Sequence, residues 1–246
     1  MSKVYTDTVT SIEASQDLTL GGSGDNVIVT AGATLKTNTI KDSGGNTIWT
    51  SDGSGNLSSV NDGLAGGNMV LLSTQTASNA ASVSFTSGID STYKLYIFKY
   101  YDVNPATDNI QFSFQCSTDG GSNYNTTMTT TFFRTSHDEA DTWAGLGYLD
   151  TCDQAQGTSY QQFGETDPGI GNGSDESGVG ILHLFSPSNT TYVKHFYARS
   201  TYYQYNDRSN HSFVAGYFNT TGAIDAISFK MASGNFDGTV KMYGVG

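Results

Sequence analysis

Apolar and polar residues alternate along much of the chain after residue 69, and Gly, Asn, Asp, Ser or Pro separate the alternating runs. In the runs 112–116 and 227–231, Phe, Ile, Met or Cys occupies every second position. A period of two is typical of strands that bury one face. The strand candidates of this part are residues 69–74, 82–85, 93–101, 110–116, 180–185, 192–200, 212–218, 223–231 and 239–243. This spacing predicts an antiparallel, jelly-roll-like β-sandwich over residues 69–246. The longest stretch without a strand pattern, about 136–177, is expected to be loop-rich and acidic.

Residues 1–62 have a different pattern, because short β-like pieces carry only one or two apolar side chains between Gly, Asn and Asp. Such a segment cannot bury enough surface to offset the entropy of ordering, about 1–2 kcal/mol per residue. Either it is disordered, or several copies wrap together around a shared core. The regular recurrence of Val, Ile and Leu favours the second alternative and predicts a short β stalk, followed by a flexible linker at 63–68. The candidate residues of the shared stalk core are Leu18, Leu20, Val27, Val29, Leu35, Ile40 and Ile48.

The charge balance limits the class of partner. Lys and Arg number 11 against 23 Asp and Glu, which gives a formal charge of -12. Nucleic-acid binding depends on neutralising phosphates, so we expect no nucleic-acid partner. The same charge repels acidic polysaccharides and anionic membranes unless it is segregated on the surface. No apolar run reaches the roughly 18–20 residues of a membrane span, and the first residues lack a secretory h-region, so we expect a chain made in a cytoplasm without membrane insertion.

Candidate catalytic and metal sites are weak. The cluster His137, Asp138, Glu139 and Asp141 could bind a metal or transfer protons, but neighbouring loop residues splay apart, and a solvated loop is the simpler interpretation. The acidic loop 165–177 offers oxygen ligands among glycines, without the spacing of an EF-hand. No nucleophile elbow or zinc motif is present, and two cysteines do not form a disulfide framework. We therefore expect no enzymatic activity, no cofactor and no metal.

Tyrosines concentrate near polar side chains at residues 197–208. Tyrosine suits contacts with sugars or proteins, because its ring packs while its hydroxyl forms hydrogen bonds. Alternate members of the group could instead fill the core of the sandwich. The candidate receptor contacts are Tyr202, Tyr203 and Tyr205, together with Trp143 from the acidic stretch.

The two-part pattern resembles the fibre-like virion proteins of marine bacteriophages, especially cyanophages. The N-terminal segments TLGGSGD at 19–25, VTAGA at 29–33 and IKDSGGNTI at 40–48 are similar to their stalks. The segments FTSGIDSTY at 85–93, STDGG at 117–121, HFY at 195–197 and AGYFNTT at 215–221 are similar to their globular heads.

This resemblance implies a homotrimeric fibre, assembled in the host cytoplasm and located on the virion. Its stalk would be fixed to other virion proteins of the capsid or tail, and its head would face a host-surface glycan or protein. The short stalk fits a stubby tail or head fibre better than a long tail fibre. Two alternatives remain: a capsid decoration protein whose head binds no receptor, and a carbohydrate-binding module.

Overall fold

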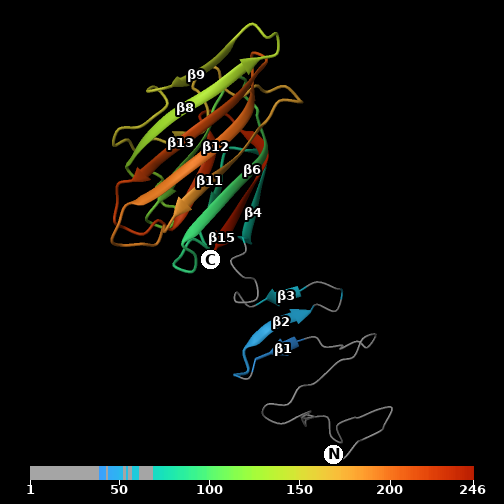
Figure 1. The fold of residues 1–246 in the computed structure, drawn as a ribbon, viewed down its shortest axis with the longest axis vertical. Coiled ribbons are helices and arrows are strands. Elements are labelled where there is room, and N and C mark those ends of the chain that lie inside the picture. The colour runs from blue at the N-terminus through green and yellow to red at the C-terminus, as the bar shows by residue number, and fades with distance from the viewer. Residues whose placement is uncertain (1–38, 43, 52–53, 55–56, 61–68) are drawn as a thin grey trace, which may run out of the picture. The chain divides into compact units, whose positions relative to one another are not determined.

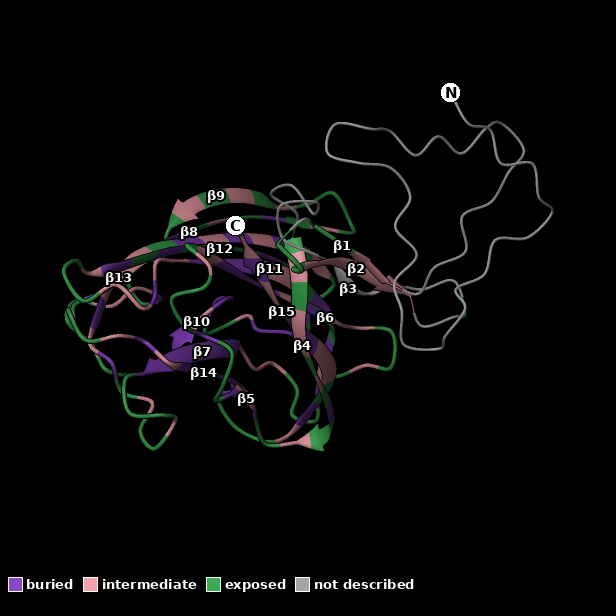
Figure 2. Cartoon of the chain, turned by 90° about the horizontal axis from the view of Figure 1, so that it is seen from below, coloured by how far each residue is buried: buried purple, intermediate pink, exposed green. Residues whose placement is uncertain are grey.

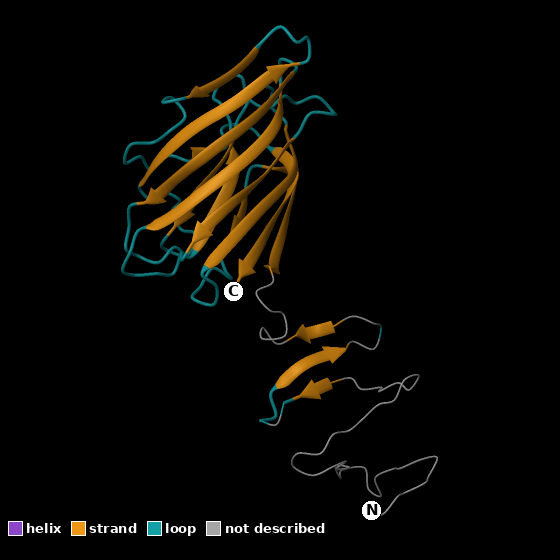
Figure 3. Ribbon diagram, in the orientation of Figure 1, coloured by secondary structure: helices purple, strands orange, loops and turns teal. Residues whose placement is uncertain are grey.

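The computed structural model describes residues 39–42, 44–51, 54, 57–60 and 69–246. The chain divides into two compact units, Met1–Leu64 and Ala65–Gly246, and the division falls within the predicted linker at 63–68. All regular elements of the described residues are β-strands (Figure 3). None of these residues forms a helix able to cross a bilayer. The expectation of an all-β fold is confirmed.

The described part of the first unit is a three-stranded antiparallel sheet in the order β1-β2-β3. Its strands are β1 (Thr39–Lys41), β2 (Thr47–Ser51) and β3 (Leu57–Val60). The β1–β2 turn is closed by Asp42, whose carboxylate accepts hydrogen bonds from the backbone N–H of Gly44 and Asn46 at 2.9 and 2.8 Å. The predicted core residues Leu18, Leu20, Val27, Val29 and Leu35 lie outside the described residues.

The second unit is an antiparallel β-sandwich of two unequal sheets. The larger sheet has the order β4-β15-β6-β11-β12-β13-β8-β9 and the smaller one β10-β7-β14-β5. The larger sheet comprises β4 (Met69–Ala80), β6 (Leu95–Pro105), β8 (Met128–Asp138), β9 (Ala144–Tyr148), β11 (Gly178–Phe185), β12 (Lys194–Gln204), β13 (Arg208–Phe218) and β15 (Phe236–Val245). The smaller sheet comprises β5 (Val83–Phe85), β7 (Phe112–Ser117), β10 (Gln161–Gln162) and β14 (Ala226–Met231). The chain passes repeatedly from one sheet to the other, and Figure 2 shows the smaller sheet enclosed under the larger one.

Aromatic rings fill the space between the two sheets. The apolar positions predicted in β7 and β14 are fully buried at Phe112, Phe114 and Phe229, but the expected exposed face is wrong, because the polar positions between them are covered as well. Phe114 packs edge-on against Phe196 of β12 at 5.2 Å and stacks on Phe163 at 4.9 Å. Burying one such ring contributes about 1.5–3 kcal/mol, so this layer supplies much of the stability of the second unit. Cys116 and Cys152 are free and buried, and burial raises the pKa of the Cys116 thiol well above its usual value.

Candidate functional site

The two ends of the second unit differ. At one end β4 begins with Met69, which pairs with Val245, the last residue of β15. We call this end, where the chain enters and leaves the sandwich, the base. At the opposite end, the tip, β8 turns into β9 and β12 turns into β13 (Figure 1). Three of the four predicted receptor contacts, Trp143, Tyr203 and Tyr205, lie in or beside these two turns.

The β8–β9 turn is held by the carboxylate of Asp138. Asp138 accepts hydrogen bonds from the backbone N–H of Thr142 and Trp143, both at 2.9 Å, and from the Thr142 hydroxyl at 2.5 Å. These bonds favour the charged carboxylate and lower its pKa to about 2, the Thr142 side chain having the largest effect. The backbone N–H of Glu139 donates to the carbonyl of Asp207 at 3.1 Å, so the two turns are tied together.

Trp143 lies near two arginines from neighbouring strands. The guanidinium carbon of Arg208 is 4.4 Å from the centre of the indole ring, and that of Arg134 is 5.2 Å away. Each cation–π contact contributes about 0.5–1 kcal/mol at an exposed site and more when water is excluded. The two cations therefore fix the orientation of a half-buried indole at the tip.

Tyr203 connects the two turns through its hydroxyl group. That group lies 3.0 Å from Glu139 Oε1 and 3.1 Å from Asp207 Oδ1. The carboxylates hold the phenolic proton, Glu139 most strongly, and this raises the pKa of Tyr203. We call Glu139, Trp143, Tyr203, Asp207 and Arg208 the tip cluster; Tyr205, in the β12–β13 turn, is 41 % exposed beside it.

The prediction that Tyr202 contacts a receptor is wrong for this structure, because Tyr202 is only 3 % exposed. Residues alternate between the two faces of β12, and the even-numbered positions point into the sandwich. The Tyr202 hydroxyl accepts a hydrogen bond from the backbone N–H of Glu165 at 2.8 Å, and burial raises its pKa. Tyr202 is therefore a core residue under the tip.

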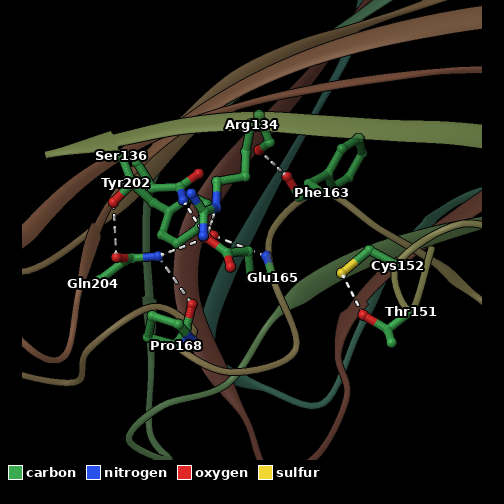
Figure 4. A network of polar contacts seen from close by, with 11 residues as sticks. Arg134, Ser136, Thr151, Cys152, Phe163, Glu165, Pro168, Tyr202 and Gln204 are labelled. Carbon is green, nitrogen blue, oxygen red and sulfur yellow. Dashed lines mark hydrogen bonds and ion pairs between the residues drawn. The ribbon is translucent and has the colours of Figure 1, made fainter. Parts of the chain in front are cut away.

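A buried polar network lies beneath the tip cluster (Figure 4). Its centre is Glu165, whose Oε1 forms an ion pair with Arg134 Nε at 2.6 Å. The same oxygen accepts hydrogen bonds from Asn210 Nδ2 at 2.7 Å and Gln204 Nε2 at 3.2 Å. Gln204 also donates to the carbonyl of Pro168 at 3.2 Å. The network joins β8, β12 and β13 to the loop after β10 and places Arg134 under Trp143.

The acidic groups of the tip do not converge on one point. In the loop 165–177, Asp167 accepts from Asn109 Nδ2 at 3.0 Å, and Glu176 accepts from the backbone N–H of Gly173 at 2.5 Å. In the 137–141 cluster, His137 Nε2 pairs with Asp141 Oδ1 at 3.1 Å, separately from Asp138. Across the described residues, no group of three or more His, Cys, Asp or Glu side chains is placed to hold a metal ion.

Sequence reasoning missed Arg134, Ser136 and Glu165, which organise the tip from below. Arg134 and Ser136 follow Phe132 at intervals of two, so their positions on the inner face could have been inferred from β8 had that strand been recognised. Glu165 lies in a loop, and no local pattern distinguishes it from exposed carboxylates. Comparison of the chain with protein-family models, with curated proteins and with solved structures returned no significant match.

Proposed function

We propose that this chain is a structural protein of a bacteriophage virion: a short, homotrimeric fibre whose second unit contacts the host surface. One observation carries the proposal, the contrast in burial between the two units. Among residues 39–42, 44–51 and 54 of the first unit, none is buried, and Ile40, Ile48 and Trp49 are each only partly covered. The second unit, in contrast, contains a complete aromatic core.

A small sheet whose Ile40, Ile48 and Trp49 are only partly covered gains little from folding alone, because burial of apolar surface is the main favourable contribution. Further copies of the same sheet would cover Ile40, Ile48 and Trp49 and supply that burial. This supports an assembly role for the first unit, and Ile40 and Ile48 are the described members of the predicted shared core. The number of copies, three, and the setting on a virion rest on the resemblance of both units to fibre-like virion proteins.

The position of the tip supports the attachment role. The described strands of the second unit begin at Met69, at the base, so the tip is the end of the sandwich that lies farthest from this point along the strands. The indole of Trp143 and the rings of Tyr203 and Tyr205 combine apolar area with polar groups, as contact surfaces do. The proposal assigns the chain no catalytic role.

Sedimentation of the full-length protein in the analytical ultracentrifuge tests the assembly. We expect a species of three times the chain mass of 26.2 kDa. Ile48→Asp, which places a charge on the sheet, should shift this species to single chains, whereas Lys41→Asp at an exposed position should not. Single chains for the unaltered protein over the micromolar range would overturn the proposal.

Antibody labelling of the virus particles that contain the chain tests the setting. Label at the tail supports attachment to the host. Label distributed over the capsid, together with failure of the purified protein to block adsorption, assigns the chain to capsid decoration instead.

A further inference from the structure

The larger sheet has an outer face that points away from the core, and this face carries large side chains that nothing in the second unit covers. Alternation along β6, β8, β11 and β12 turns Tyr101, Phe133, Val179 and Tyr197 outward. Their exposed fractions are 37, 42, 41 and 40 %. Exposed apolar groups that lie together on one face mark an interaction surface.

The register of the strands arranges part of this face in one row. Lys241 of β15 lies opposite Lys99 of β6, which lies opposite Ile181 of β11. The row continues through Arg199, Phe213 and Phe133 to Tyr148 of β9. We call these seven residues the cross-strand row. With neighbouring strands about 4.8 Å apart, the row spans roughly 30 Å and suits an extended polymer better than a single small molecule.

The cations of the cross-strand row have no acidic partner among the residues that the structure describes. The described residues form two ion pairs, Arg134–Glu165 and His137–Asp141, and neither includes Lys99, Arg199 or Lys241. Each of the three cations lies over a ring instead: Lys99 over Tyr243, Arg199 over Phe213 and Lys241 over Tyr101, at 5.4, 4.9 and 5.7 Å. Lys99 and Lys241 are like charges directly opposite each other, which destabilises a sheet unless an anion binds between them.

Negative charge is sparse on this face although the whole chain carries -12, and at the β9 end of the row the Tyr148 hydroxyl donates to Asp153. The seven strands from β15 to β9 contain three carboxylates, Asp102, Asp138 and Asp237, all toward the tip ends of their strands. Three histidines, His183, His195 and His211, also face outward on the same sheet. Burial, and to a smaller extent the neighbouring Lys99, lowers the pKa of His183, and burial followed by Arg199 lowers the pKa of His211. The charge of the protein is therefore segregated.

Two hollows lie next to the cross-strand row, toward the base. One, of about 390 Å³, is lined by Tyr197, Tyr217 and the β8 threonines, and the other, of about 550 Å³, by Asn189 and Tyr192. Both include Phe185 and His195, so they are neighbours. Ring faces combined with amide and hydroxyl groups at the edge match the two sides of a sugar ring, one apolar and one bearing hydroxyl groups.

We propose that the outer face of the larger sheet binds an acidic polysaccharide, whose carboxylates or sulfates lie along Lys241, Lys99 and Arg199 and whose sugar rings pack on the neighbouring aromatic side chains. A second copy whose cross-strand row packed on this one would supply no carboxylate to the three cations, because the row contains none, and this disfavours that occupant. A nucleic acid is disfavoured because its binding depends chiefly on phosphate neutralisation, and three cations neutralise few phosphates. The inference rests on the sheet alone and does not depend on the trimer.

Calorimetric titration of the full-length protein with a polygalacturonate oligomer tests this inference, with dextran and oligothymidylate as comparison ligands. We expect polygalacturonate to bind, its affinity to fall as salt is added, and dextran to bind at least tenfold more weakly. Lys99→Gln should weaken polygalacturonate binding about tenfold, and addition of Arg199→Gln should remove it. Lys230→Gln is the matched control, because Lys230 lies over the Tyr160 ring at 4.4 Å on the smaller sheet; it should leave the affinity unchanged.

The proposal is overturned if polygalacturonate does not bind, if Lys230→Gln weakens binding as much as Lys99→Gln, or if oligothymidylate binds as tightly. Thermal unfolding of each variant checks that the sandwich is intact. If the double variant instead alters sedimentation of the protein, the face is a contact between copies and the proposal is overturned as well. Loss of the trimer with retained polygalacturonate binding would count against the fibre and leave this inference standing.

Discussion

Replacement of Glu165 by Gln tests whether the buried network holds the tip in place. Glu165 is 5 % exposed, and its Oε1 lies 2.6 Å from Arg134 Nε, 2.7 Å from Asn210 Nδ2 and 3.2 Å from Gln204 Nε2. A glutamine amide has no charge to balance Arg134, and it adds an N–H₂ group to a pocket already lined by donors.

The expected loss follows from the burial of the partner charge. Removal of one member of a buried ion pair destabilises a protein by about 3–5 kcal/mol, because the other charge is left without compensation. The Arg134 side chain is 14 % exposed, so water compensates it in part. We therefore expect a loss of about 3 kcal/mol, near the lower limit of that range.

Urea unfolding of the full-length protein, followed by near-ultraviolet circular dichroism, measures the loss. Trp49→Phe leaves Trp143 as the single tryptophan, so that its fluorescence reports the tip directly. Glu139→Gln is the control, since this exposed carboxylate binds only Tyr203 at the surface and should change stability by less than about 1 kcal/mol.

A double replacement, Arg134→Met with Glu165→Leu, separates a lost charge from lost packing. Apolar substitutes for a whole buried ion pair are often neutral or stabilising, so the double variant should be more stable than Glu165→Gln. A loss below about 1 kcal/mol for Glu165→Gln, or a double variant as unstable as the sum of its single changes, would refute this account of the network.

Two further predictions concern local features. Asp138 should titrate near pH 2 rather than at its ordinary 3.8, as followed by NMR; a lowered carboxyl pKa stabilises the fold above pH 3.8, and that contribution disappears as the pH falls toward 2. A titration midpoint of Asp138 near pH 3.8 would show that the hydrogen bonds from Thr142 and Trp143 do not form. Gly216→Ala should lower the free energy of unfolding by about 1–3 kcal/mol, because its Cβ would lie 2.4 Å from the carbonyl oxygen of Thr129. Gly147→Ala, with nothing within 4 Å, should be tolerated, and equal effects of the two changes would contradict the close approach.

The sequence predicts those strands whose inward positions are apolar. The predictions at 110–116 and 223–231 correspond to β7 and β14, in which Phe112, Phe114 and Phe229 fill the core. Strand ends were less predictable: β4 continues to Ala80, six residues beyond the predicted end, because this edge strand pairs with β15 along its whole length. Edge strands need bury only part of one face, and this weakens the hydrophobic pattern.

The strands β8, β9 and β10 were not predicted, and residues 136–138 and 144–148 fall in the region expected to be loop-rich. In β8 the inward positions after Phe132 are Arg134, Ser136 and Asp138, which belong to the tip and its polar network. A period of two in polarity is therefore absent from this part of the strand. This segment nevertheless forms a strand, because Glu165 and Gln204, which are distant in the sequence, satisfy its polar groups.

The candidate site was predicted only in part. Trp143, Tyr203 and Tyr205 lie at the tip, but alternation along β12 was not sufficient to separate Tyr202 from Tyr203 without knowing which face meets the core. The cross-strand row could not be inferred at all, because Lys99, Arg199 and Lys241 meet only through the register of four strands.

The pairing of Met69 with Val245 also determines how the sandwich bears a mechanical load. A pull applied through Met69 and resisted at the tip acts along β4, parallel to the strand and perpendicular to the hydrogen bonds that join it to β15. All bonds of the ladder from Met69–Val245 to Ala80–Phe236 then share the force in shear, instead of breaking one after another as in unzipping. A sandwich loaded in this way resists unfolding along the whole β4–β15 ladder.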